Sequence, residues 1–269
     1  VVLNHTFGPK SELTLTGYLS HDRFSLNRDT VYAYENKSVS LQWRVDLSKR
    51  LNATFTGGGD KYRNKIHNTK KPGNPHALDF TVDQKHLKGH FNYYATDNQT
   101  IDFGWSNIYY NISPGNFGPD GDQSEVAKDE VQRDRGIDSA LYVNDKFDIT
   151  TNLSLAAGLR FSLFNYMRPG SVNIYSPGKP KEEENIVDTA HYGKGKFIKT
   201  YGGPEYRASL RYALSEKCSV KIGCNTTRQY IHLLSNTAAM APTDTWKLSD
   251  PNITPQAGAQ LRCPARALR

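Results

Sequence analysis

The 269-residue sequence predicts an all-β protein, built as an antiparallel up-and-down sheet of about eleven strands, and three observations support this fold class. Apolar and polar residues alternate with a period of two along most of the chain. The alternating stretches hold about ten to fourteen residues, which is about twice a typical soluble strand and close to the length that crosses a bilayer at a tilt. Short and long connections follow one another in turn.

Residues 151–165 contain the clearest of these strands. Leu155, Leu159 and Phe161 fall on one face of an extended chain, whereas Ser154 and Arg160 fall on the other. A helix would scatter the leucines around its circumference. We therefore expect a strand with one continuous apolar stripe and one polar face.

The same pattern predicts the other strands in chain order. The alternation is complete at residues 38–47 and is repeated at residues 204–214. The remaining predicted strands cover residues 1–7, 11–24, 51–56, 77–95, 99–112, 136–147 and 218–230, with a last extended piece from Ile253.

Connections of two kinds separate these strands. Short turns are predicted near residues 8–10, 48–50, 96–98, 148–150 and 215–217. Long loops are predicted near residues 25–36, 58–76, 113–135, 167–202 and 233–252. Up-and-down membrane barrels have this asymmetry, with tight turns at one end and long loops at the other.

The composition narrows the class of protein. A mean hydropathy of -0.67 and the lack of any run near 18 apolar residues argue against membrane helices, but a membrane barrel exposes only alternate residues to lipid. The net charge of +7 comes from spread lysines and arginines without a basic block, so we expect no nucleic-acid partner. Tyrosines cluster near strand ends, where interfacial girdles lie.

Periodicity alone does not say which face points inward. A transmembrane barrel would turn the apolar stripe to lipid, whereas a soluble β protein would bury it. The soluble alternative is a secreted, carbohydrate-binding protein whose aromatic residues form ligand platforms.

Several stretches favour the transmembrane barrel, because they resemble one family of outer-membrane proteins. Residues 228–237, 242–246 and 255–260, together with 103–115, 158–162 and 203–212, are similar to the barrel of TonB-dependent receptors with a carboxypeptidase-regulatory-like N-terminal extension. The resemblance covers nearly the whole chain. It implies an outer-membrane location in a Gram-negative cell, contact with membrane lipid, and about half of a barrel of about 22 strands. It also implies energised uptake of an unidentified ligand.

The resemblance further implies a signal peptide, an energy-coupling box, a plug domain and an inner-membrane TonB complex as partner, and none of these is encoded in the 269 residues. Residues 1–260 would be a partial barrel. Residues 261–269 lack alternation and contain Pro264, so we expect an atypical tail and a truncated or frame-shifted reading.

The sequence predicts no catalytic residue, cofactor or metal site, and hence no enzyme. His86 and His90 have the helical zinc spacing but would lie about 13 Å apart on a strand. Residues 182–184, the pair Asp120 and Asp122, and the loop at 193–196 are interpreted as solvated charges in Pro/Gly-rich segments.

One set of charged residues is a candidate for ligand contact on the polar face. The basic members are Arg44, Lys88, Arg160, Arg207, Arg211 and Lys221. The acidic members are Asp46, Asp102, Asp138 and Glu205. They predict either a salt-bridged, hydrated inner wall that contacts a plug or a basic lining that favours an anionic ligand.

Overall fold

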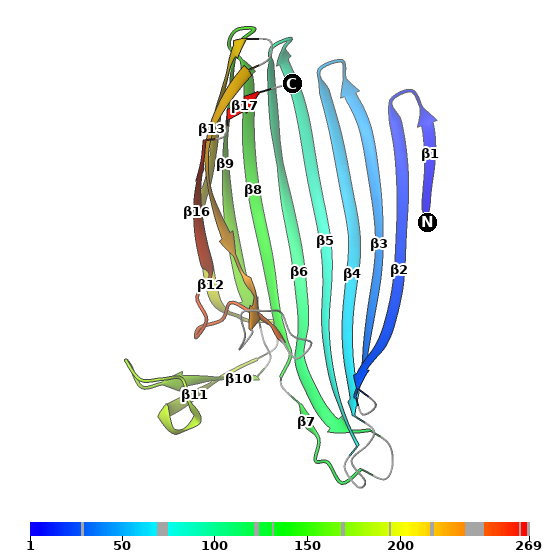
Figure 1. Cartoon of the computed structure of the whole chain (residues 1–269), viewed down its shortest axis with the longest axis vertical. Helices are drawn as coiled ribbons and strands as arrows, with labels where there is room; N and C mark the ends of the chain where they lie inside the picture. Colours follow the sequence, from blue (N-terminus) through cyan, green and yellow to red (C-terminus); the bar gives the residue numbers. More distant parts are fainter. Residues whose placement is uncertain are drawn as a thin grey trace.

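Eleven strands form one continuous antiparallel sheet in chain order (Figure 1). The computed structural model describes residues 1–27, 30–68, 75–120, 124–130, 132–167, 170–193, 195–215, 218–234, 245–263 and 265–267. The strands of the sheet are β1 (Val2–Gly8), β2 (Ser11–Asn27), β3 (Thr30–Ser48), β4 (Leu51–Asn68), β5 (His76–Thr96), β6 (Gln99–Pro119), β8 (Asp134–Asp148), β9 (Leu153–Met167), β12 (Phe197–Ser215), β13 (Cys218–Gln229) and β16 (Gln256–Arg262). The predicted all-β, up-and-down class is confirmed.

Smaller elements lie at the margins of this sheet. They are β7 (Asp129–Glu130), β10 (Gly170–Tyr175), the 3-10 turn η1 (Glu183–Asn185), β11 (Ile186–Tyr192), β14 (Ile231–Leu234), β15 (Thr245–Leu248) and β17 (Ala265–Ala267). The pair β10–β11 extends beyond one end of the sheet in Figure 1. Strands β1 and β16 form the two edges, so the sheet is an open section rather than a closed barrel. No helix among the described residues is long and apolar enough to span a membrane.

The strands are longer than the sequence predicted. Strands β5 and β6 each contain 21 residues, which corresponds to about 70 Å and exceeds the thickness of a bilayer. The loops predicted at 58–76, 113–135 and 167–202 are therefore too long, because β4, β6 and β12 extend into them. Ladder hydrogen bonds use backbone groups alone, so pairing continues where the hydrophobic alternation has ended.

The prediction of a long loop at residues 25–36 is wrong. Strand β2 continues to Asn27 and β3 begins at Thr30, which leaves residues 28 and 29, outside the described part of the chain, as the connection. Phe24 stacks on Tyr32 with ring centroids 5.2 Å apart, and such cross-strand aromatic pairs stabilise a hairpin above the apolar region. The short connections after β1, β3, β5 and β8 are confirmed, whereas Glu216 and Lys217 lie outside the described residues.

The two faces of the sheet differ as the alternation predicted. On the apolar face, Leu141, Leu159 and Phe161 expose 67%, 46% and 52% of their surface. A soluble sheet would bury such side chains against a second layer, and none of the described elements covers them. We refer to this exposed apolar face as the outer face and to the opposite one as the inner face.

The core lies on the inner face, near the end of the sheet that carries the long connections. Ile112, Phe164 and Tyr166 are fully buried there and belong to one cluster with Tyr230 and Leu248. The last two come from the segment that carries β14 and β15, which packs against β6 and β8. The loop predicted at 233–252 thus contains a small two-stranded sheet, although residues 235–244 lie outside the described part.

Some of residues 261–269, which were predicted to form an atypical tail, pair with β13. Strand β16 pairs with β13 through Arg262, which lies opposite Gly223. Strand β17 resumes the pairing in the same register, with Ala265 opposite Val220. Pairing is therefore present on both sides of residues 263 and 264, and Pro264 itself lies outside the described residues.

Candidate functional site

A chain of polar contacts crosses the inner face from β5 to β8. Asn92 donates a hydrogen bond of 2.6 Å to Asp102 Oδ1, and its amide nitrogen also lies 3.1 Å from His90 Nε2. The other nitrogen of the His90 ring, Nδ1, lies 2.8 Å from the Tyr142 hydroxyl. All four residues are at inward positions of consecutive strands because their registers align across β6. The arrangement is a fixed polar wall rather than a set of separate solvated charges.

Glycines on the same face leave the space that these side chains occupy. A Cβ added to Gly104 would lie 2.6 Å from the Tyr142 hydroxyl and 2.2 Å from the carbonyl oxygen of Gly89. A Cβ on Gly158 would lie 2.1 Å from Asn144 Oδ1. Tyr142 can therefore lie over β6 toward His90, whereas Asn144 lies over β9, on the side of a cavity next to that strand.

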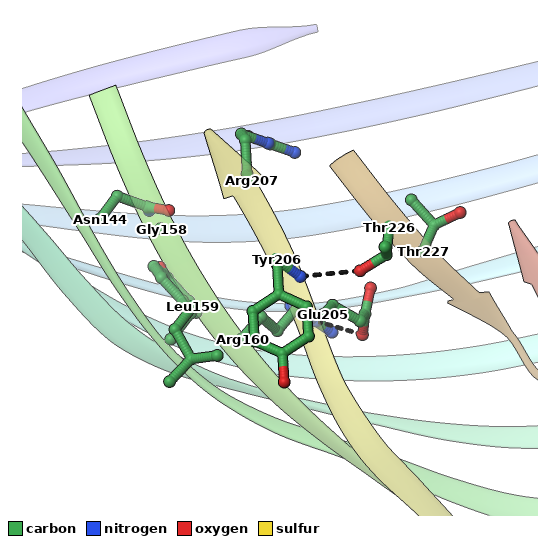
Figure 2. Close-up of a pocket in the computed structure, with 10 residues that line it drawn as sticks. Asn144, Gly158, Leu159, Arg160, Glu205, Tyr206, Arg207, Thr226 and Thr227 are labelled. Carbon is green, nitrogen blue, oxygen red and sulfur yellow. Dashed lines mark hydrogen bonds and ion pairs between the residues drawn. The ribbon is translucent and has the colours of Figure 1, made fainter. Parts of the chain in front are cut away.

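This cavity lies where β13 diverges from β12. The ladder between these strands ends at the pair Arg207 and Asn225, and beyond it the Tyr206 backbone N–H donates to Thr226 Oγ1 at 2.8 Å. The cavity has a volume of about 230 Å³ (Figure 2). Its lining consists of Tyr142, Asn144, Gly158, Leu159, Arg160, Glu205, Tyr206, Arg207, Thr226 and Thr227.

Two arginines and one glutamate line the cavity, so its charged side chains carry a net positive charge. Arg160 Nε lies 3.4 Å from Glu205 Oε1, and Figure 2 shows this ion pair beneath Tyr206. Arg207 is exposed and also lines the cavity. One arginine is thus balanced by a carboxylate and the other is available to a bound group, together with hydroxyl and amide groups that can donate or accept hydrogen bonds.

The structure does not gather the six predicted basic residues into one site. Arg160 and Arg207 line the cavity together. Arg211 lies opposite Lys221 nearer the turn end of the sheet, and Lys88 lies opposite Ser106 on the inner face of β5. Arg44 lines a separate hollow of about 460 Å³ with Glu12, Thr14, Gln42, Asn52, Thr54, Asn92 and Tyr94. The basic residues therefore fall into several groups along the inner wall.

Sequence reasoning missed the neutral members of the cavity. Tyr142, Asn144 and Thr227 were not singled out, although Tyr142 and Asn144 alternate with the apolar Leu141 and Val143. Assigning every second residue of that strand to the inner face would have identified both residues. The alternation also assigns Thr227 to the polar face of residues 218–230, but its place at the cavity depends on where β13 separates from β12.

The other flagged charges have separate partners. His86 Nδ1 lies 3.4 Å from Asp60 Oδ2, whereas His90 contacts Tyr142, so the two histidines do not share a partner. Asp120 Oδ2 lies 2.9 Å from His67 Nδ1. Asp122 and Lys194 lie outside the described residues.

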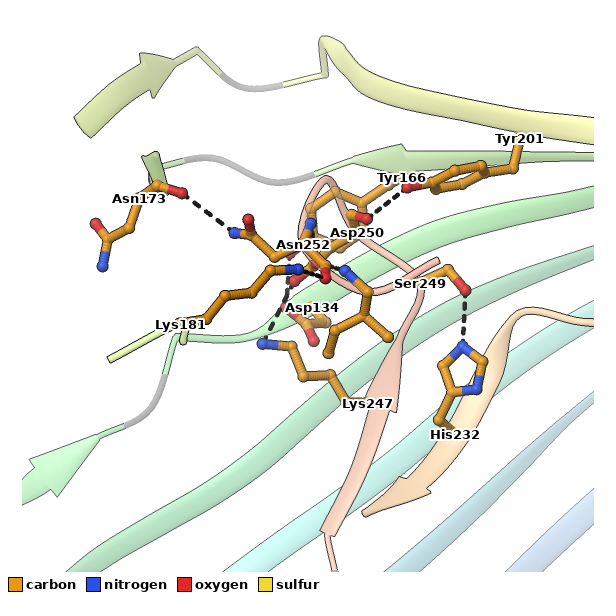
Figure 3. Close-up of polar contacts among 11 residues, drawn as sticks. Asp134, Tyr166, Asn173, Lys181, Tyr201, His232, Lys247, Ser249, Asp250 and Asn252 are labelled. Carbon is orange, nitrogen blue, oxygen red and sulfur yellow. Dashed lines mark hydrogen bonds and ion pairs between the residues drawn. The ribbon is translucent and has the colours of Figure 1, made fainter. Parts of the chain in front are cut away.

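Residues 245–253 pack on the inner face near the end of the sheet that carries the long connections, and Figure 3 shows their polar contacts. The Tyr201 hydroxyl donates to the Asp250 carbonyl oxygen at 2.7 Å. Asn252 Nδ2 donates to the Asn173 carbonyl oxygen at 3.2 Å, which joins this segment to β10. Asp250 Oδ1 accepts the backbone N–H groups of Asn252 and Ile253, both at 2.7 Å.

A buried histidine anchors the same segment. His232 Nε2 lies 2.8 Å from Ser249 Oγ, and both side chains are buried. Burial lowers the pKa of His232, and the nearby Asp250 carboxylate opposes this shift. The neutral imidazole is therefore favoured at the site.

A second anchor joins the segment to the sheet. The Tyr230 hydroxyl lies 2.8 Å from Ser162 Oγ, and the Tyr230 ring stacks on Phe164 with centroids 4.9 Å apart. The Ser249 backbone N–H donates to the Tyr230 carbonyl oxygen at 2.8 Å. Residues 230–234 and 245–253 are thus held against the inner wall at several separate points.

An up-and-down antiparallel sheet that exposes apolar side chains on one face and polar side chains on the other is a section of the wall of a membrane-spanning β-barrel. Residues 2–260 match the family model described as TonB dependent receptor-like, beta-barrel. The chain belongs to this family, as its resemblance predicted. No curated protein gives a significant match to the sequence.

Solved structures with the same fold are transport receptors. A copper transporter, OprC, has a TM-score of 0.62 at 12% identity over 85% of this chain and 36% of its own. The Serratia marcescens hemophore receptor HasR, solved with its hemophore HasA and heme, has a TM-score of 0.62 at 8% identity over 95% of this chain and 39% of its own. The siderophore receptor PiuA from Acinetobacter baumannii has a TM-score of 0.58 at 12% identity over 95% of this chain and 45% of its own.

These three comparisons cover 85–95% of this chain but less than half of the proteins it matches. The family and its solved relatives are receptors and transporters of the outer membrane, not enzymes. The predicted half-barrel architecture agrees with this coverage. At these identities, the likeness concerns the fold and not the ligand.

Proposed function

We propose that this chain forms part of the wall of an outer-membrane receptor that takes up a scarce, negatively charged ligand without chemical conversion. Energy would come from an inner-membrane TonB complex acting through a plug domain, as family membership implies. The predicted outer-membrane location in a Gram-negative cell is part of the same proposal. The secreted carbohydrate-binding alternative does not agree with a family of membrane receptors.

The observation that carries the proposal is the cavity that contains Arg160 and Arg207. Both arginines occupy inward positions of β9 and β12, on the face that lines the interior of a barrel of this kind. Two guanidinium groups against one carboxylate favour an anion, since a guanidinium forms paired hydrogen bonds with carboxylate or phosphate oxygens. Asn144 and Thr227 add neutral polar groups that orient a bound molecule.

A binding experiment tests this proposal. The receptor is purified from outer membranes and incubated with the fraction of spent growth medium that an anion exchanger retains. Native mass spectrometry then detects any bound small molecule. Wild-type protein should retain a molecule that Arg207→Gln loses, while Arg44→Gln, in the separate hollow, should retain it. Equal retention by all three proteins would contradict the proposal.

Energised transport needs its own measurement. Uptake of the retained molecule into intact cells should stop when a protonophore collapses the inner-membrane potential, whereas binding to the cells should continue. Uptake that continues without the potential would contradict the TonB-dependent part of the proposal and leave the binding site intact.

A further inference from the structure

Basic residues border the apolar band on the outer face at the loop end. On β3 the outward residues Val39, Leu41, Trp43, Val45 and Leu47 form an apolar stretch, and the next outward residue beyond Val39 is Lys37. This stretch spans about 26 Å along the strand at about 3.3 Å per residue, close to the height of about 25 Å of the apolar band on membrane barrels. Lys37 therefore lies at the level where lipid headgroups begin.

The neighbouring strands repeat this arrangement. On β4 the outward series Phe55, Gly57 and Gly59 is followed by Lys61. On β5 the outward series Phe91, Gly89 and Leu87 is followed by Lys85, and on β8 Arg135 follows Ile137. Four strands thus have a basic residue at the same border, although their turns and lengths differ.

The register places three of these lysines next to one another. Lys37 is the direct partner of Lys61, and Lys85 is the partner of Gly59, one outward position below Lys61. Direct partners have Cβ atoms about 5 Å apart and diagonal neighbours about 7 Å apart. All three side chains are exposed. Lys37 pairs with Glu35, and Lys61 lies opposite Asp83 of β5, so carboxylates offset part of this positive charge. The lysines in direct register still repel one another, and an anion between them would stabilise the arrangement.

A hollow next to the lysines extends the basic surface. It has a volume of about 370 Å³ and its lining includes Lys61, Arg63 and Arg133. Its acidic residues are partly neutralised, since Arg63 Nε donates to Asp79 Oδ1 at 3.0 Å. Outward positions in residues 35–37, 61–65, 79–85 and 133–135 hold the basic residues Lys37, Lys61, Arg63, Lys65, Lys85, Arg133 and Arg135 against the acidic residues Glu35, Asp79 and Asp83.

We propose that Lys37, Lys61 and Lys85 bind the phosphate groups of lipid headgroups in the membrane leaflet around the loop end of the barrel. Clustered lysines at a membrane surface attract anionic headgroups, and each contributes a binding factor of about five. The position next to the apolar band favours a lipid over a free anion, because the acyl chains can contact the exposed apolar side chains of the outer face. This inference depends on the membrane-spanning orientation of the sheet and not on the imported ligand.

Native mass spectrometry of the receptor in detergent with added diphosphoryl lipid A tests the inference. The test variant combines Lys37→Gln, Lys61→Gln and Lys85→Gln. The control variant combines Lys10→Gln, Lys49→Gln and Lys146→Gln, which alters three exposed lysines near the turn end. A heat-dependent mobility shift on gels confirms that both variants are folded.

Wild-type and control proteins should retain the lipid equally, and the test variant should bind it about a hundredfold more weakly. A lipid A derivative without phosphate should not be retained. Equal retention by the test and control variants, or equal retention of the derivative without phosphate, would overturn the inference. Uptake of the imported ligand by the test variant should remain unchanged, so failure here is distinct from failure of the proposed transport function.

Discussion

The Tyr142 hydroxyl reaches across a whole strand to contact His90. The two residues lie on β8 and β5, their atoms are 2.8 Å apart, and Gly104 of β6 lies in register between them. A side chain at residue 104 would occupy this path. The polar wall of the inner face therefore depends on a glycine as much as on the polar residues themselves.

Replacing this glycine should disrupt the wall. In Gly104→Ala the new methyl group would meet the Tyr142 hydroxyl and a backbone oxygen, so we expect a destabilisation of about 1–3 kcal/mol. The temperature at which the heat-dependent gel shift occurs measures this change. Gly17→Ala is the matched control, since its Cβ would meet nothing within 4 Å. Similar shifts in both variants would contradict the proposed role of Gly104.

Removing a charge from the cavity should change ligand affinity in a definite direction. Glu205→Gln removes the carboxylate that partners Arg160, so an anionic ligand should bind more tightly, by about fivefold to tenfold. Arg207→Gln should weaken binding by a similar or larger factor. The dissociation constant of the molecule retained from growth medium is the measurement. A change of the same sign in both variants would show that charge does not determine affinity.

The hydrogen bond between Tyr230 and Ser162 should stabilise residues 245–250 on the inner wall. Tyr230→Phe keeps the ring that stacks on Phe164 but loses the bond, at a cost of about 1 kcal/mol. Amide hydrogen exchange at Ser249, whose N–H bonds Tyr230, should be about fivefold faster. Tyr18→Phe, at an exposed tyrosine, should leave this rate unchanged.

The stability of the same segment should decrease in acid. Because burial lowers the pKa of His232 below the unfolded value of about 6.5, the folded state binds fewer protons than the unfolded state between the two values. The stabilisation is complete above about pH 6.5 and is lost as the pH falls through the folded pKa. Exchange at Ser249, corrected for the intrinsic rate, should show this loss in the wild type and not in His232→Gln.

The half of the sheet nearest the turns was predictable from the sequence. Outward Leu155, Leu159 and Phe161 give a strong period of two there, and short polar turns separate the strands. At the loop end the outer face is also polar, as at Lys61 and Arg63, so the hydrophobic signal disappears while the ladder continues. This is why the predicted loops were too long.

The candidate site was predictable only in part. Arg160 and Arg207 could be assigned to the inner face, because each lies in a strand with regular alternation. Their shared cavity could not be predicted, because it depends on the divergence of β13 from β12 beyond Arg207. The packing of residues 245–253 on the inner face could not be predicted either, since their contacts with Asn173 and Tyr201 join residues far apart in sequence.

The assignment of the inner and outer faces depends on the orientation of β9, and site-directed spin labelling tests this orientation directly. Single nitroxide labels would be placed at residues 155 to 162 of the receptor in outer membranes, after replacement of the native cysteines. Labels at Leu155, Leu159 and Phe161 should be accessible to oxygen dissolved in the lipid, and labels at Ala156, Arg160 and Ser162 should be shielded from it. The opposite phase, with Arg160 facing lipid and Leu159 shielded, would contradict the assignment of the two faces.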